Sequence, residues 1–97
     1  MNVVSRAKLV AFWTEHPPAK APLEAWYAIA RRAEWRSPQD VREQFNSADF
    51  VADNRVIFNI GGNNYRLVAR IAYSHKQLLI KFVGTHKAYD AIDPASV

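Results

Sequence analysis

The sequence of 97 residues contains no cysteine, which excludes disulfide bonds and thiolate metal sites. It also has no run of apolar residues approaching the roughly 18 that a membrane-spanning helix requires. The first residues, MNVVSRAKLVAFW, lack the basic start and long apolar stretch of a secretory signal peptide. These absences predict a protein that stays in the reducing cytoplasm and has no membrane partner.

Acidic residues are missing from one long stretch of the chain. No Asp or Glu occurs between Asn54 and Tyr89, and residues 54–97 carry six Lys or Arg but only two acids. Residues 1–53 carry seven of each sign, so the whole net charge of +4 lies in the second half. A one-sided charge of this kind suggests a polyanionic partner.

The composition provides enough apolar material for one core. Hydrophobic residues make up 49% of the chain and aromatic residues 12%, which is typical of a globular protein. Two domains in a chain this short could not each bury a core, so we expect a single domain over residues 1–97. No metal or cofactor is needed for folding.

The spacing of apolar residues predicts helices first and strands afterwards. A helix is expected from Ser5 to the His16-Pro17-Pro18 break, a second from about Pro22, and a short third after Ser37. The period then changes to two, which predicts strands over residues 55–60, 65–73 and 78–84. The expected fold class is therefore α+β, with N-terminal helices packed on a C-terminal antiparallel meander and a short strand at residues 1–4 as a candidate addition.

The strand pattern also predicts which residues face each other. Pairing Ile60 with Tyr65 and Tyr73 with Leu78 turns one apolar face toward the helices. Its members are Val56, Phe58, Ile60, Tyr65, Leu67, Ala69, Ile71, Tyr73, Ile80 and Phe82. The other face carries the basic residues together with Ile57, Val68, Ala72, Leu79 and Val83.

On that second face the predicted register aligns cations across three strands. Arg70 lies between Arg55 and Lys81, and Arg66 lies between Asn59 and Thr85. Like charges directly opposite one another destabilise a sheet, so folding alone gives no reason for the row. A bound phosphate backbone would explain it, as would an acidic partner protein, and a solvated sheet face without a ligand is the third alternative.

Residues 84–90 bring together the groups that RNA cleavage without a metal requires. The 2′-hydroxyl of RNA can attack the adjacent phosphate if a base, an acid and nearby cations assist. His86 is suited to carry protons near neutral pH and arginine to hold phosphate, while Tyr89 could stack a base or donate a proton. If the strand stayed extended, His86 would point toward the core, so it can act only if the chain turns after Thr85. The alternative is a hydrogen-bonded structural histidine, with Asp90 orienting its neighbours.

Other conspicuous residues are expected to be structural. Trp13, Trp26 and Trp35 have the spacing of core residues rather than of a base-stacking platform. The spacing of His, Asp and Glu matches no zinc or carboxylate metal site, so the predicted reaction uses no metal and no cofactor.

Two segments resemble the signature of HigB-type toxins within the RelE-like superfamily. They are RVIFNIGGNNYRLV at residues 55–68 and IKFVGTHKAYD at residues 80–90, and the segments 25–27 and 35–41 are similar too. The resemblance implies a RelE-like fold, cleavage of messenger RNA on the ribosome, and neutralisation by a HigA-type helix-turn-helix antitoxin. It implies contact with operator DNA only through the antitoxin complex.

The resemblance assigns the catalytic positions to Arg66, His86 and Tyr89, with Lys87 and Asp90 beside them. The predicted RNA-binding residues are Arg55, Arg70, Lys81, Asn59 and Asn63. Because ParE-like toxins share this fold and act on gyrase, a non-enzymatic binding module is the alternative function. Such a module would use the same basic face to bind RNA or gyrase.

Overall fold

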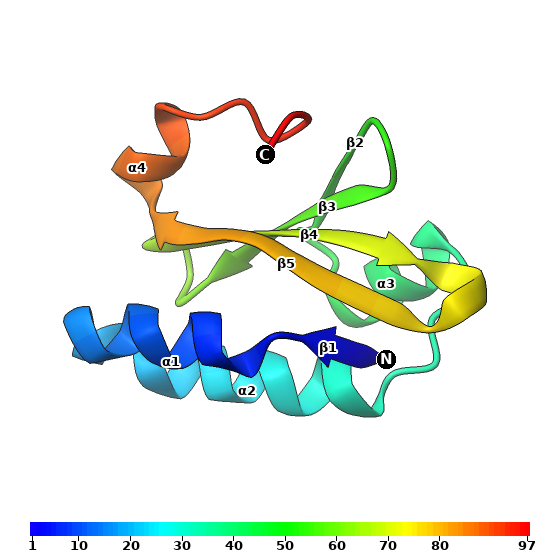
Figure 1. Ribbon diagram of the computed structural model, residues 1–97, viewed down its shortest axis with the longest axis horizontal. Helices are drawn as coiled ribbons and strands as arrows, with labels where there is room; N and C mark the ends of the chain where they lie inside the picture. Colours follow the sequence, from blue (N-terminus) through cyan, green and yellow to red (C-terminus); the bar gives the residue numbers. More distant parts are fainter.

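The computed structural model describes residues 1–97 as helices packed on a five-stranded mixed sheet (Figure 1). The strands lie in the order β1-β5-β4-β3-β2, and only the β1–β5 pair is parallel. Their bounds are β1 Asn2–Val4, β2 Asp49–Val51, β3 Arg55–Ile60, β4 Tyr65–Ala72 and β5 Gln77–Thr85. The predicted α+β class, including the strand at the start of the chain, is confirmed.

The helices lie on two sides of the sheet. Helices α1 (Arg6–Glu15) and α2 (Lys20–Arg32) pack together on one face, and a single 3-10 turn over Pro17–Ala19 connects them. Helix α3 (Pro38–Gln44) begins after Ser37 as predicted. Helix α4 (His86–Asp90) and the last residues of the chain lie on the opposite face of the sheet (Figure 1). None of these helices has the length and apolar character needed to cross a membrane.

The core lies between the sheet and the first two helices. Trp26 and Trp35 are each 2% exposed, and their rings pack within 5.4 Å and 6.2 Å of the Phe58 ring. Trp13 is also buried. The three tryptophans therefore belong to the core, as their spacing indicated.

The register of the β3–β4 hairpin is the predicted one. Arg55 pairs with Arg70, Asn59 with Arg66, and Ile60 with Tyr65. Gly61 and Gly62 both adopt positive φ angles, of 61° and 68°, in the connection between the strands. Glycine adopts such angles without steric cost, which explains the two residues at this turn.

The predicted register of β5 is wrong for two reasons. Tyr73 lies in a 3-10 turn, Tyr73–His75, so Ile71 and not Tyr73 pairs with Leu78, a shift of two residues that keeps Leu78 and Ile80 on the core face. The strand also contains a bulge. On β4, the neighbours Val68 and Ala69 pair with Phe82 and Ile80, so Lys81 is an extra residue without a partner. From this point on, the two faces of β5 are exchanged relative to the prediction. Phe82 leaves the core face and Val83 packs against the core instead.

Two elements were not predicted. Strand β2 has only three residues and lies in the segment that its polar composition marked as a break. Helix α4 begins where the sequence pattern left the chain extended or turning. Both are shorter than the windows in which periodicity can be recognised.

Candidate active site

Arg66 lies near the start of the central strand β4, on the face that carries α4. It belongs to β4 and pairs with Gly84 of β5, not with Thr85 as the sequence had indicated. The residue is 9% exposed, and its guanidinium donates to the side-chain oxygen of Asn63 at 2.7 Å and to the carbonyl oxygens of Asn63 and Tyr65. No carboxylate pairs with it, so the fixed cation keeps its charge available for an anion.

The chain turns after Thr85, which is the condition under which His86 can act. The Thr85 hydroxyl oxygen accepts a hydrogen bond from the amide of Ala88 at 3.1 Å and so caps α4. The amide of His86 donates to the carbonyl oxygen of Asn64 at 3.1 Å, which fastens the start of α4 to the β3–β4 turn. The helix therefore carries His86 out of the sheet instead of into the core.

Tyr89 lies over Arg66. The guanidinium carbon of Arg66 is 5.9 Å from the centre of the Tyr89 ring, within the range of a cation–π contact. Partial burial raises the pKa of the Tyr89 phenol above its ordinary value, and the charge of Arg66 opposes this shift only in part. Near neutral pH Tyr89 is therefore a protonated group that can donate, not a base.

His86 forms a pair with Asp90 one helical turn later. Its Nδ1 is 3.1 Å from a carboxylate oxygen of Asp90, and the side chains of His86 and Asp90 are 44% and 61% exposed. A carboxylate at Nδ1 orients the ring and leaves Nε2 free for a substrate. Lys87 lies on the same helix, exposed to solvent and without an ion pair.

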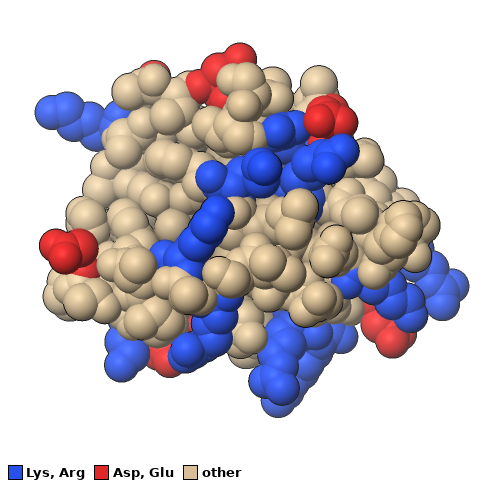
Figure 2. Space-filling model, in the orientation of Figure 1, with Lys and Arg blue, Asp and Glu red and all other residues tan.

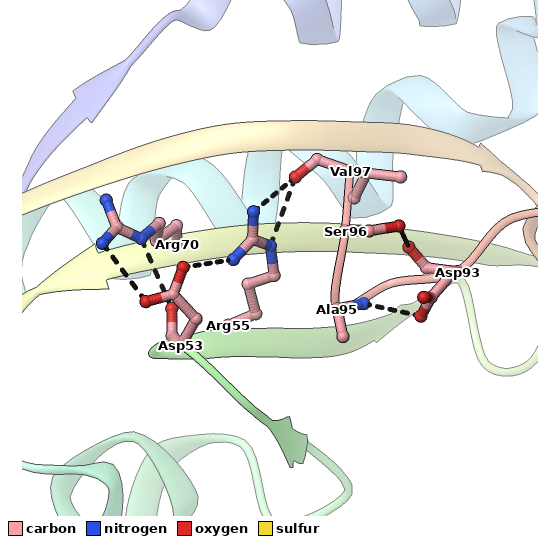
Figure 3. Close-up of polar contacts among 7 residues, drawn as sticks. All are labelled: Asp53, Arg55, Arg70, Asp93, Ala95, Ser96 and Val97. Atoms are coloured by element: carbon pink, nitrogen blue, oxygen red, sulfur yellow. Dashed lines mark hydrogen bonds and ion pairs between the residues drawn. The ribbon is translucent and has the colours of Figure 1, made fainter.

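The repulsion between Arg55 and Arg70, the two arginines of the predicted cation row, is compensated by a carboxylate. Asp53, just before β3, places one carboxylate oxygen 2.9 Å from Arg55 and the other 3.4 Å from Arg70 (Figure 3). These two arginines hold the pKa of Asp53 below its ordinary value. The premise that folding provides no reason for the row is therefore wrong for this pair.

Arg55 is also covered by the end of the chain. Its Nε and one terminal nitrogen donate to the oxygen of Val97 at 3.2 Å and 2.6 Å (Figure 3). The turn that brings Val97 there is held by Asp93, which accepts from Ala95 and Ser96. Arg55 is consequently only 8% exposed, whereas the Arg70 side chain remains 44% exposed.

The other predicted RNA-binding residues lie in different surroundings. Lys81 is not opposite Arg70, since Leu79 takes that place and Lys81 is the bulged residue. It lies beside α1, where it lines a hollow together with Lys8 and Phe12. Asn59 donates to the carbonyl oxygen of Ser47, and Asn63 holds Arg66.

Basic side chains are nevertheless prominent on the face seen in Figure 2. There the Lys and Arg atoms form a diagonal band across the middle and further groups along the lower edge, while the Asp and Glu atoms lie mainly toward the rim. The six bases of residues 54–97 contribute to an unbalanced charge that a polyanion would neutralise.

Sequence reasoning missed Asp53 and Phe82. Asp53 lies one residue before the acid-free stretch. Its φ is positive, 63°, and directs the carboxylate back toward the strand, but such a backbone angle leaves no pattern in the sequence. Phe82 was assigned to the core, yet its ring lies 6.5 Å from that of Tyr89. The available signal was Gly84, because a glycine within a strand often marks a close approach.

The side chains that could hold a metal do not gather. No group of three or more His, Asp or Glu residues is arranged to hold an ion. The chemistry that the site offers consists of a fixed arginine, a protonated phenol, and a histidine oriented by a carboxylate.

Comparison with known proteins gives one family. Residues 19–92 match the model of HigB_toxin, described as the RelE-like toxic component of a toxin–antitoxin system. An mRNA interferase HigB from Escherichia coli O6:H1 is 26% identical over 94 residues, covering 95% of this chain and 91% of that protein. The mRNA interferase toxin HigB of E. coli K12 is 28% identical over 92 residues, covering 93% and 88%. An mRNA interferase HigB from Shigella flexneri is also 28% identical over 92 residues, with the same coverage.

Proposed function

Because the chain belongs to the HigB family of RelE-like toxic components of toxin–antitoxin systems, we propose that it is an endoribonuclease that cleaves messenger RNA. The relatives named above are mRNA interferases, which supports the substrate class. The observation that carries the proposal is the position of α4, which holds Tyr89 over Arg66 and presents His86 beside it on the same helix. Membership of the family also implies a cognate antitoxin.

The proposed reaction is an attack of the RNA on itself. The 2′-oxygen bonds to the adjacent phosphorus while the bond from phosphorus to the 5′-oxygen breaks. This gives a 2′,3′-cyclic phosphate and a free 5′-hydroxyl. One proton leaves the 2′-hydroxyl and another reaches the departing 5′-oxygen, so the reaction consumes no water and needs no metal.

Each residue of the site has a matching part in this scheme. Arg66 stabilises the charge that develops on the phosphorane, an effect worth about 10²–10³ in rate for one donor. His86, oriented by Asp90, exchanges a proton with the RNA through Nε2. Tyr89, whose raised pKa keeps it protonated, donates to the phosphate or to the leaving oxygen.

The RNA backbone is bound by the cations around this centre. We assign phosphate contacts to Arg70, Lys81 and Lys87, which are exposed, and further contacts to the amides of Asn59 and Asn63. Arg55 can reach RNA only when the segment that ends at Val97 moves away from it. We place the reaction in the cytoplasm, on ribosome-bound messenger RNA, under the control of a HigA-type helix-turn-helix antitoxin that brings the complex to its operator.

The test is to express the protein without an antitoxin and map new 5′ ends on cellular transcripts. The expected ends carry 5′-hydroxyls, matched by cyclic phosphates, and cleavage of a purified RNA continues in excess EDTA. Arg66→Ala, His86→Ala and Tyr89→Phe should each relieve growth inhibition, with losses that are not additive if the residues act together. Binding of the antitoxin by each variant is the control for folding. Growth inhibition without new 5′ ends would contradict the proposal and favour a gyrase-type binding module.

A further inference from the structure

The bulge in β5 places an aromatic side chain beside the candidate active site. Phe82 pairs with Val68 and so shares the face of Arg66, whose partner is Gly84. The Phe82 ring is 6.5 Å from the Tyr89 ring at an interplanar angle of 52°. Arg66, Tyr89 and Phe82 thus form a row in which each member neighbours the next.

Gly84 makes the position of the Phe82 ring possible. A Cβ atom at Gly84 would lie 2.5 Å from Cζ of Phe82, closer than such contacts occur, and 3.0 Å from Cε2. The ring therefore lies against the bare backbone of the strand. Phe82 remains partly exposed there.

Phe82 also forms one border of a hollow at the edge of the sheet. Strand β1 pairs only with Gln77–Leu79, so the outer edge of β5 has no strand neighbour beyond Leu79, and α1 lies beside it (Figure 1). The hollow between them is shallow and open to solvent, with a volume of about 520 Å³. Its lining consists of Lys8, Ala11, Phe12, Glu15, His16, Lys81, Phe82 and Val83.

The lining has the chemistry of a site for single-stranded nucleic acid. Lys8 donates to the carbonyl oxygen of Ile80 at 3.0 Å, which fixes its ammonium group at this edge and leaves two donors free. Lys81 is exposed, and the only acid of the lining is Glu15. Aromatic faces between cations bind bases by stacking and phosphates by charge, without regard to sequence.

We infer that Phe82 and the hollow between β5 and α1 form a nucleotide subsite. A base next to the scissile phosphate stacks on Phe82, and its phosphate lies between Lys8 and Lys81. This inference rests on the proposed function, and it extends the substrate contact from the reacting phosphate to a neighbouring nucleotide. The bulge then has a functional consequence, since it adds Lys81 to the edge of this subsite while Phe82 stays on the face of Arg66.

Stacking can be measured directly with RNA that contains 2-aminopurine, whose fluorescence falls when it stacks on an aromatic ring. A set of short single-stranded RNAs carries the probe at each position in turn and a 2′-O-methyl group at the cleavage site. Each RNA is used free and on ribosomes programmed with it. For the parent protein we expect quenching at one position adjacent to the cleavage site.

Variants separate stacking from packing. Phe82→Trp should retain the quenching, while Phe82→Leu should abolish it and weaken binding by about 5- to 150-fold, the range for stacking of one base. Gly84→Ala should have the same effect with Phe82 intact, because the added methyl group displaces the ring. Lys81→Gln should lower the dependence of binding on salt by about one counterion, whereas Lys76→Gln, at the other end of β5, should not.

The outcomes distinguish this inference from the proposed function. The subsite is overturned, and the proposed function is not, if the parent protein cleaves RNA and both Phe82→Leu and Gly84→Ala quench the probe and bind RNA as well as the parent does. A parent that neither binds nor cleaves RNA would overturn the function itself. Circular dichroism and thermal unfolding show whether each variant is folded. If Phe82→Leu is not folded, the quenching and binding of Gly84→Ala decide whether the subsite exists.

Discussion

Asn63 acts on the proposed chemistry through its neighbour. Its side-chain oxygen accepts from Arg66 at 2.7 Å, and its carbonyl oxygen accepts from the same guanidinium at 3.3 Å. A long side chain loses its fixed orientation when such partners are removed, even though its charge remains. We therefore regard Asn63 as a positioning residue for Arg66.

Replacing Asn63 by Ala should slow RNA cleavage by about 10- to 150-fold, because a hydrogen bond to a charged group contributes about 1.5–3 kcal/mol. Cleavage rates at saturating RNA, with Asn63→Asp as the variant that keeps an acceptor, measure the effect. We expect Asn63→Asp to recover most of the rate and Arg66→Lys to recover little. Equal rates for Asn63→Ala and the parent would show that the backbone contacts alone hold Arg66.

Asp53 makes the stability of the fold depend on pH in the acid range. Its pKa lies below the ordinary 3.8, chiefly because it hydrogen-bonds to Arg55 and secondly because of the charge of Arg70. A carboxyl group with a lowered pKa stabilises the fold above its unfolded pKa, and this contribution is lost as pH falls through the folded value. Asp53→Asn should therefore be less stable than the parent at pH 7, with a difference that shrinks below pH 4.

Denaturant unfolding of the parent and of Asp53→Asn across this pH range checks the expectation. The matched control is Asp93→Asn, since Asp93 lies on the same face but forms no ion pair with either arginine. A difference between parent and Asp53→Asn that stays constant down to pH 2 would contradict the role of the ionised carboxylate.

Among the elements, α4 depends on the residue that precedes it, Thr85. A helix of five residues is too short to be stable by itself, and the Thr85 hydroxyl supplies its N-terminal cap. Loss of a cap costs about 0.5–2 kcal/mol. Because α4 contributes none of the fully buried side chains, that loss falls on the position of His86 and Tyr89 more than on the whole fold.

Thr85→Val should accordingly lower the cleavage rate more than the melting temperature. Thermal unfolding together with cleavage of one RNA substrate measures both effects. Thr85→Ser keeps the hydroxyl and should behave like the parent. If Thr85→Val lowered the melting temperature strongly and left the rate unchanged, α4 would be a structural element and not part of the site.

Strand β5 shows where sequence patterns reach their limit. The β3–β4 register followed from alternating residues and the Gly61-Gly62 turn, because one face there is apolar and the other carries arginines. Residues 78–83 are apolar on both sides of the strand, apart from Lys81, so alternation is compatible with either face. The bulge at Lys81 could therefore not be recognised, and Phe82 was placed on the wrong face.

At the scale of the whole molecule, the charge distribution was predictable but its accessibility was not. The excess of bases in residues 54–97 is visible in the composition, and the α+β architecture follows from the change of period. The contact of Arg55 with Val97 joins residues 42 apart and leaves no local signal, and the contact with Asp53 depends on the positive φ of Asp53. The open part of the basic face is consequently Arg70 and the β5 edge.

Binding to RNA or ribosomes should fall steeply with salt, and Arg70→Ala should lower that salt dependence by about one counterion. Filter binding over a range of KCl concentrations measures this slope. Since Arg70 pairs with Asp53 at an exposed position, its removal should change the free energy of unfolding by less than about 1 kcal/mol. Arg36→Ala, an exposed arginine before α3, is the control and should leave the slope closer to that of the parent. A slope unchanged by Arg70→Ala would remove Arg70 from the interface.

The bulge has a consequence for how chains of this fold can differ in length. Ile80 and Phe82 pair with adjacent residues of β4, so a chain without Lys81 would continue the ladder with no interruption. Ile80 would stay inside, Phe82 would stay beside Tyr89, and Gly84 would stay opposite Arg66. A gap of one residue at this point of an alignment therefore marks the gain or loss of the bulged lysine and leaves the residues after it in correspondence.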